Sequence, residues 1–166
     1  MPIDQRTDET FREQIEHALH NRIDDLARVI AEGGERGQGK ILPLTIQSVA
    51  YIAIDASERW PNDADLKDTA HIASESGTGL SVTEDEMYQF LSRSVFGSEA
   101  VLSVFEGNDN APVIPLFTLA NLLVSFKPPH GKGWNAWLDV IESGIEAAEK
   151  VTPLAAPAVA YLHLKK

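Results

Sequence analysis

The chain has 166 residues, of which 43% are hydrophobic and 23% are charged, a composition typical of a globular protein rather than a disordered one. It carries 25 acidic and 14 basic side chains and a formal net charge of −11, which predicts repulsion from nucleic-acid phosphates and from anionic membranes. It has no cysteine, which excludes disulfides, thiolate zinc sites and cysteine nucleophiles and fits a reducing compartment.

The first predicted element is a long amphipathic helix over 7–30. Thr7 is a capping residue, and Thr10 with Glu13 has the spacing of a capping box. Apolar residues then recur at steps of three and four as far as Ile30, where a helix stop is expected at Gly33. The sequence therefore predicts one helix followed by a glycine-rich loop over 33–43. The polar, acidic start of the chain does not resemble a signal peptide, and we expect a cytoplasmic protein.

The next segment, 46–60, is almost entirely apolar, and Thr45 is placed to cap it. Its length favours a helix, since strands usually run about five or six residues. The alternative is a strand over 46–54 that pairs with 159–164, because both contain the pattern V-A-Y-[I/L]-x-[I/L]. That pairing would add a small two-stranded sheet to the fold.

Three further helices follow from capping signals and apolar spacing. Asn62 and Asp63 cap a helix that reaches Ser76, and Thr83 with Glu86 forms a capping box for the next one. A later helix is expected from Trp134 or Asn135 to about Val151.

The most apolar run of the chain is 113–126. Its fourteen residues are too few to span a bilayer, which needs about 20, and they are apolar on nearly every side of a helix. We therefore expect a buried central helix, with Pro115 in its first turn. Asn121 and Ser125 are four residues apart on one face and are expected to share a partner, a water or a ligand. The fold predicted for 1–166 is a single all-α domain, a bundle of about six helices around 113–126.

One candidate metal site lies on the first predicted helix. Four side chains suited to metal binding fall within a stripe about 60° wide if the helix is continuous: Glu13, His17, His20 and Asp24. The stripe is opposite the apolar face, so a solvated polar face is the alternative. His71, with Asp68 and Glu75 nearby, is a candidate for a matching half-site.

A second candidate site is the loop after the central run, the main concentration of positive charge in an acidic chain. It would serve as an anion or partner contact, with its tryptophan as an aromatic anchor; its candidate residues are Lys127, His130, Lys132 and Trp134. A cationic loop at a helix C-terminus is also favoured by the helix dipole alone. An apolar ligand pocket beside the central run would be lined by Tyr51, Asn121 and Trp137.

These features favour a non-enzymatic interaction or regulatory protein with an acidic surface: an adaptor, an inhibitor, or a protein of the immunity or antitoxin type. We expect its partner to be another protein, including a second copy of the chain, and expect no nucleic acid, membrane or cofactor. No catalytic set is recognisable, although sequence alone does not show whether distant residues converge. The alternatives are a helical metalloprotein or hydrolase that uses His17 and His20, and a small-molecule sensor.

Overall fold

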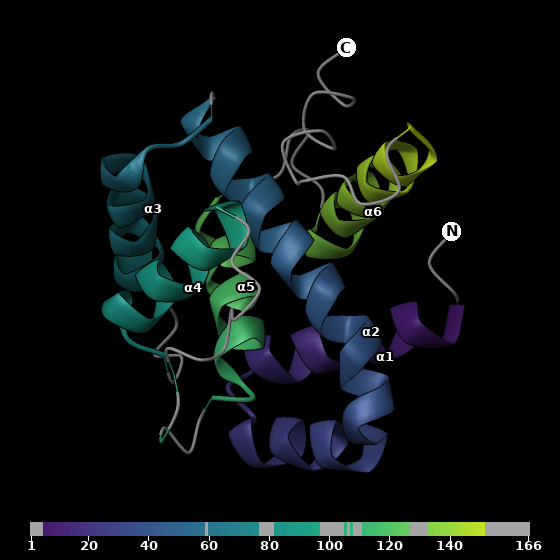
Figure 1. The fold of residues 1–166 in the computed structure, drawn as a ribbon. Coiled ribbons are helices and arrows are strands. Elements are labelled where there is room, and N and C mark those ends of the chain that lie inside the picture. Colours follow the sequence, from purple (N-terminus) through teal and green to yellow (C-terminus); the bar gives the residue numbers. More distant parts are fainter. Residues whose placement is uncertain are drawn as a thin grey trace.

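The computed structural model describes 5–58, 60–76, 82–96, 105, 107, 111–126 and 133–151, excluding the side chains of 33–40, 76, 145 and 147–151. Within these ranges the chain forms helices and no strand (Figure 1). The helices are α1 (Gln5–Leu19), α2 (Ile23–Ser57), α3 (Asp63–Ser76), α4 (Glu84–Phe96), α5 (Ile114–Ser125) and α6 (Trp134–Val151). The predicted all-α class is confirmed. The segment 46–54 is helical, whereas its alternative partner 159–164 lies outside the described residues.

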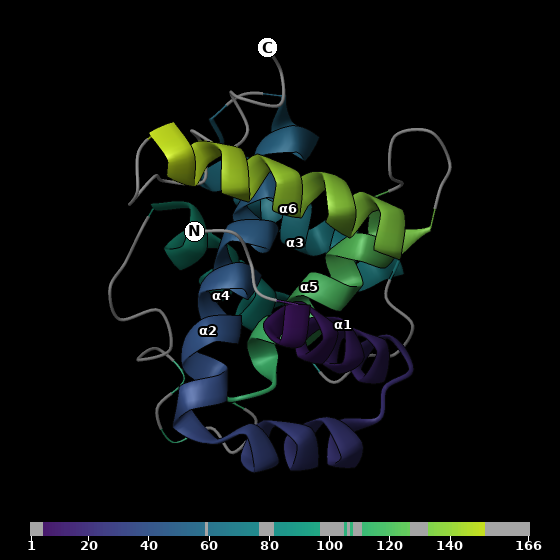
Figure 2. The ribbon, with the colours of Figure 1, turned by 90° about the vertical axis from the view of Figure 1, so that its right-hand side faces the viewer.

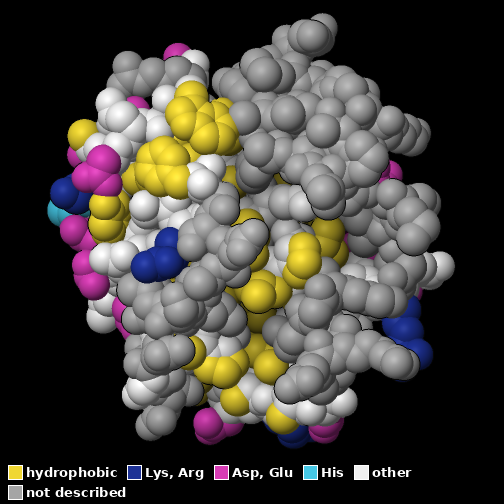
Figure 3. Space-filling model, in the orientation of Figure 1, with side chains coloured by type: hydrophobic (Ala, Val, Ile, Leu, Met, Phe, Trp, Pro, Cys, Tyr) yellow, Lys and Arg dark blue, Asp and Glu magenta, His cyan; other side chains and the backbone are white. Residues whose placement is uncertain are grey.

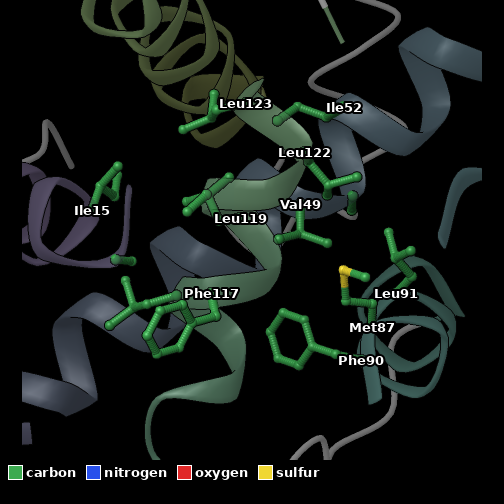
Figure 4. Close-up of a cluster of buried hydrophobic side chains, with 14 of the residues drawn as sticks. Ile15, Val49, Ile52, Met87, Phe90, Leu91, Phe117, Leu119, Leu122 and Leu123 are labelled. Atoms are coloured by element: carbon green, nitrogen blue, oxygen red, sulfur yellow. The ribbon is translucent and has the colours of Figure 1, made fainter. Parts of the chain in front are cut away.

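The predicted central helix is α5, which contacts α1, α2, α3 and α4. Every residue from Ile114 to Leu123 is buried, and Pro115 lies in the first turn, where its missing N–H costs no hydrogen bond. Figure 4 shows side chains from four helices meeting around α5: Ile15, Val49, Ile52, Met87, Phe90, Leu91, Phe117, Leu119, Leu122 and Leu123. Such enclosure explains why α5 has no polar face.

Asn121 and Ser125, two of the three polar residues of α5, have different protein partners, so the prediction of a shared protein partner was wrong. Asn121 donates through Nδ2 to the carbonyl of Phe117 in its own helix, at 2.8 Å. Ser125 instead donates to the carbonyl of Ala73 on α3, at 3.5 Å. The buried side-chain amide of Asn121 is therefore satisfied within one turn of its own helix. A helical-wheel projection does not reveal such a bond, because it shows only the directions of the side chains.

The predicted helix over 7–30 is wrong at its centre, because α1 ends at Leu19 and α2 begins at Ile23. Asn21 adopts the left-handed conformation, with φ 54°, which asparagine tolerates better than most residues. The N–H of Asn21 donates to Ala18 and the N–H of Arg22 to His17, at 3.0 and 2.9 Å. This is the hydrogen-bond pattern of a Schellman motif, with Asn21 in place of the usual glycine.

The glycine-rich segment 33–43 was predicted to be a loop, but its backbone belongs to α2. Figures 1 and 2 show α2 in two parts that meet at a sharp bend, with the first part along the bottom of both views. Glycine and an internal proline, here Pro43, are common causes of such bends. Ile41 and Leu44 are buried on either side of Pro43, so tertiary packing outweighs the poor helix propensity of the segment. Thr45 is consequently inside α2 and donates to the carbonyl of Ile41, rather than capping a new helix.

The predicted caps of α3 and α4 are confirmed. The side chain of Asn62 accepts from the N–H of Asp65 at 2.9 Å, and Asp65 accepts in return from the N–H of Asn62 at 3.0 Å. Thr83 and Glu86 form the same reciprocal pair at the start of α4, at 3.1 and 2.9 Å. Each box satisfies two backbone donors that a helix leaves free at its first turn.

Replacing Thr83 by Ala is expected to lower the free energy of unfolding by about 1 kcal/mol, since the Glu86 N–H loses its acceptor. Urea denaturation followed by circular dichroism measures this change. Thr10→Ala is the matched control. Thr10 lies inside α1 and donates only to the carbonyl of Arg6, so its loss should change stability by less than about 0.5 kcal/mol. Equal losses in the two variants would contradict the capping role of Thr83.

The last helix, α6, packs mainly against α2 and lies on the same side of the molecule as α1, the side that faces the viewer in Figure 2. Trp137, Leu138 and Ile141 form its buried stripe. None of the helices in the described part of the chain is both long and apolar enough to cross a membrane.

Candidate functional site

The most connected polar group of the described chain is Arg12, which links α1 to α6. Its Nε donates to both carboxylate oxygens of Asp8, at 3.2 and 3.1 Å. Its Nη1 donates to the carbonyl and to the side-chain oxygen of Asn135, at 3.1 and 3.0 Å, and its Nη2 donates to Asp139 at 2.6 Å. The same Nη2 lies 3.3 Å from Oε2 of Glu142. We call these five residues the Arg12 cluster. Only 20% of the arginine side chain is exposed, so the planar guanidinium is held by acceptors on every side.

Glu142 is the unusual acid of the Arg12 cluster, because its side chain is only 12% exposed. Burial disfavours its charged form, and a hydrogen-bond contact with Asp8 acts in the same direction; together they raise the pKa of Glu142 to about 8, despite the positive charge of Arg12. This carboxyl group therefore keeps its proton to a higher pH than an exposed glutamate does. Buried acids with raised pKa values are common at functional sites.

A surface pocket of about 410 Å³ opens beside the Arg12 cluster, and we call it the acidic pocket. Its walls are Glu9, Arg12, Glu13 and Glu16 from α1 and Trp134 and Asn135 from the start of α6. Glu9, Glu13 and Glu16 follow one another at steps of four and three, and Arg12 lies three residues after Glu9 and four before Glu16, which places all of them on one face of the helix.

The charge of the acidic pocket is negative, although Arg12 is part of its wall. Arg12 already faces the carboxylates of Asp8 and Asp139, so it cannot also neutralise the glutamates. Glu9 accepts a hydrogen bond from the neutral amide of Gln5, and Glu13 lies 3.9 Å from His17, so neither of these contacts adds a permanent positive charge. The half-buried indole of Trp134, which also packs against the core, completes the wall.

A second polar cluster joins α3 to α4. His71 lies 2.9 Å from Glu84 and 3.1 Å from Glu75, and these contacts raise the pKa of His71, the hydrogen bond to Glu84 more than the charge of Glu75. Tyr88 donates to Asp63, which also pairs with Lys67 at 3.2 Å. Figure 3 shows this mixture of acidic, basic and histidine side chains along α3, at the left edge of the view. Tyr88 is partly buried against the core, but the charged side chains of this cluster are more than half exposed, so the ion pairs between them are worth little free energy.

The four predicted metal ligands do not form one stripe, because that stripe requires one continuous helix from Glu13 to Asp24 and α1 ends at Leu19. Asp24 belongs to α2, and His20 lies in the turn, where Nδ1 contacts the carbonyl of Glu16 at 2.9 Å. Glu13 and His17 remain neighbours on α1. Across the part of the chain that the structure describes, no group of three or more His, Asp or Glu side chains is arranged to hold a metal ion.

The other predicted site residues do not lie together in one site. Lys127, His130 and Lys132 lie outside the described residues, whereas Trp134 is a wall of the acidic pocket. The predicted liners of an apolar ligand pocket, Tyr51, Asn121 and Trp137, are buried side chains, and the acidic pocket does not include them.

The Arg12 cluster was missed at the level of the sequence. Asn135, Asp139 and Glu142 recur at steps of four and three, a spacing that indicates one polar face on α6. Nothing in the sequence identifies Arg12 as their common partner, because it lies 123 residues before Asn135. The convergence is a product of tertiary packing.

Comparison of the chain with protein-family models, curated proteins and solved structures finds no match. Its function is therefore argued from the geometry of its own residues.

Proposed function

We propose that the chain is a non-enzymatic helical interaction protein that binds a basic segment of a partner protein in the acidic pocket. One observation carries this proposal: three glutamates and an indole line the same pocket, while the only arginine in its wall is already paired with acids. Carboxylates form strong hydrogen bonds with guanidinium and ammonium groups, and the face of a tryptophan attracts the same cations. A pocket of about 410 Å³ is large enough for one or two side chains.

The net charge of −11 supports the same type of partner. A negative surface speeds the encounter with a basic protein, and the pocket then supplies the specific contact. We therefore expect ionic strength to change mainly the association rate and replacement of Trp134 to change mainly the dissociation rate.

The test uses a fluorescently labelled peptide of eight arginines and measures its affinity by anisotropy in about 0.15 M salt. A Glu9→Gln, Glu13→Gln, Glu16→Gln variant is expected to bind at least about tenfold more weakly than the wild type, a difference of about 1.4 kcal/mol. Trp134→Ala should weaken binding in addition, because the aromatic wall is lost.

The control removes the same amount of charge elsewhere. Asp24→Asn, Glu32→Gln, Asp68→Asn neutralises three exposed acids on α2 and α3 and is expected to change the affinity less than about twofold. Equal weakening in both triple variants would show that the peptide responds only to overall charge, and the pocket proposal would then be abandoned.

A further inference from the structure

The attachment of α6 to α1 depends on one face of the first turns of α6. Asn135, Asp139 and Glu142 lie on that face, and the guanidinium of Arg12 reaches all three. Trp134 immediately precedes Asn135, so the same contacts place the indole at the acidic pocket. The position of this pocket wall therefore depends on the state of the Arg12 cluster.

The oxygen atoms of Glu142 are unequally satisfied. Oε2 faces Arg12, whereas Oε1 is buried and receives no hydrogen bond from the described part of the chain. A buried oxygen of a charged carboxylate without a donor is costly. The nearby acid is Asp8, which pairs with the same guanidinium as Glu142, and two carboxyl groups can form a hydrogen bond only when one of them is protonated.

We propose that a proton on the buried carboxyl group of Glu142 holds the start of α6 against α1 and thereby keeps Trp134 in place as the wall of the acidic pocket. This inference names the regulation of that pocket and rests on its proposed function. Release of the proton to solvent leaves three carboxylates, on Asp8, Asp139 and Glu142, around the single positive charge of Arg12. Their mutual repulsion then loosens α6 and withdraws the indole.

The charged groups that face Glu142 are Asp8 and Arg12 on α1 and Asp139 on its own helix, whereas α2 supplies none of the principal interactions that set its pKa. The folded-state pKa, about 8, is above the ordinary value of 4.5. The stabilisation from the proton is therefore complete below about pH 4.5 and is lost as the pH rises through about 8. Between pH 6.5 and 9.5, binding should accordingly weaken as the pH rises.

The test measures the affinity for the eight-arginine peptide from pH 6.5 to 9.5, a range in which arginine keeps its charge. The wild type is expected to lose about tenfold in affinity across this range, whereas Glu142→Gln should show a flat profile. Glutamine can donate to Asp8 and accept from Arg12 without titrating. Glu75→Gln, an exposed acid on α3, is the matched control and should keep the wild-type pH profile.

Two NMR readouts on the full chain do not need the peptide. The side-chain carboxyl of Glu142 should titrate with a midpoint near pH 8, and the indole resonance of Trp134 should shift with the same midpoint in the wild type but not in Glu142→Gln. A carboxyl midpoint below pH 6, or identical pH profiles for the wild type and Glu142→Gln, would overturn the inference. Failure of the peptide to bind at any pH would instead remove the proposed function, and the two NMR titrations would still decide whether the proton positions α6.

Discussion

A Phe117→Ala variant is expected to lose about 3–5 kcal/mol of unfolding free energy, the largest effect predicted here. Phe117 is fully buried on α5, the helix that contacts α1, α2, α3 and α4. Truncation of its ring removes apolar contacts and leaves a cavity that the surrounding helices fill only partly. Because most domains are stable by only about 5–15 kcal/mol, the variant should be close to unfolding at physiological temperature.

Urea denaturation followed by circular dichroism at two protein concentrations measures this loss. Val124→Ala is the control on the same helix, because its side chain is 41% exposed and its truncation should cost less than about 1 kcal/mol. Similar losses for the two variants would contradict the central, enclosed position of α5.

An Arg12→Met variant is expected to lose about 2–4 kcal/mol, since it leaves the acids of the Arg12 cluster without their cation. Methionine keeps most of the apolar stem of arginine, so the change reports mainly on charge and hydrogen bonds. The loss should grow with rising pH, because Arg12 stabilises the charge that the wild-type Glu142 gains as the pH rises through about 8, and the variant has no positive group that does so.

The matched control is Arg28→Met, which removes an arginine whose pair with Asp25 is exposed. Arg28 lies 3.3 Å from Asp25, with 62% and 49% of the two side chains exposed. Such surface pairs are worth less than about 1 kcal/mol, so this variant should be close to the wild type in stability. Equal losses in Arg12→Met and Arg28→Met would show that the Arg12 cluster contributes no more than an ordinary surface contact.

The proposed function combines two sequence predictions that were separate before the fold was known. The acidic surface was predicted to meet a protein partner, and Trp134 was predicted as an aromatic anchor within a cationic loop. The structure places Trp134 among glutamates of α1 instead, which makes a cationic ligand the better match for the indole. The roles of Lys127 and Lys132 in that loop stay predictions, since both residues lie outside the described part of the chain.

Local signals predicted the core and the starts of α3 and α4, but the caps predicted at Thr10 and Thr45 were wrong, because both residues lie inside helices. Thr83 with Glu86 and Asn62 with Asp65 depend on residues within one turn, and the chain supplies both partners of each pair. The burial of 114–123 was predictable for a similar reason, because a run that is apolar on all sides has no face that gains from contact with water. Local signals were misleading at 33–43, where glycine and proline favour a loop but neighbouring core residues sustain a helix.

The sequence by itself determined the all-helical class, the central position of α5, the helix starts at α3 and α4, and the sign of the surface charge, because each follows from composition or from residues a few positions apart. Only the tertiary structure decided the bend of α2, the Arg12 cluster and the acidic pocket. The cluster joins residues 8–12 to 135–142, and the raised pKa of Glu142 exists only where folding removes its carboxyl group from water. Burial and contacts between distant residues produce this raised pKa, and no local sequence pattern predicts either of them.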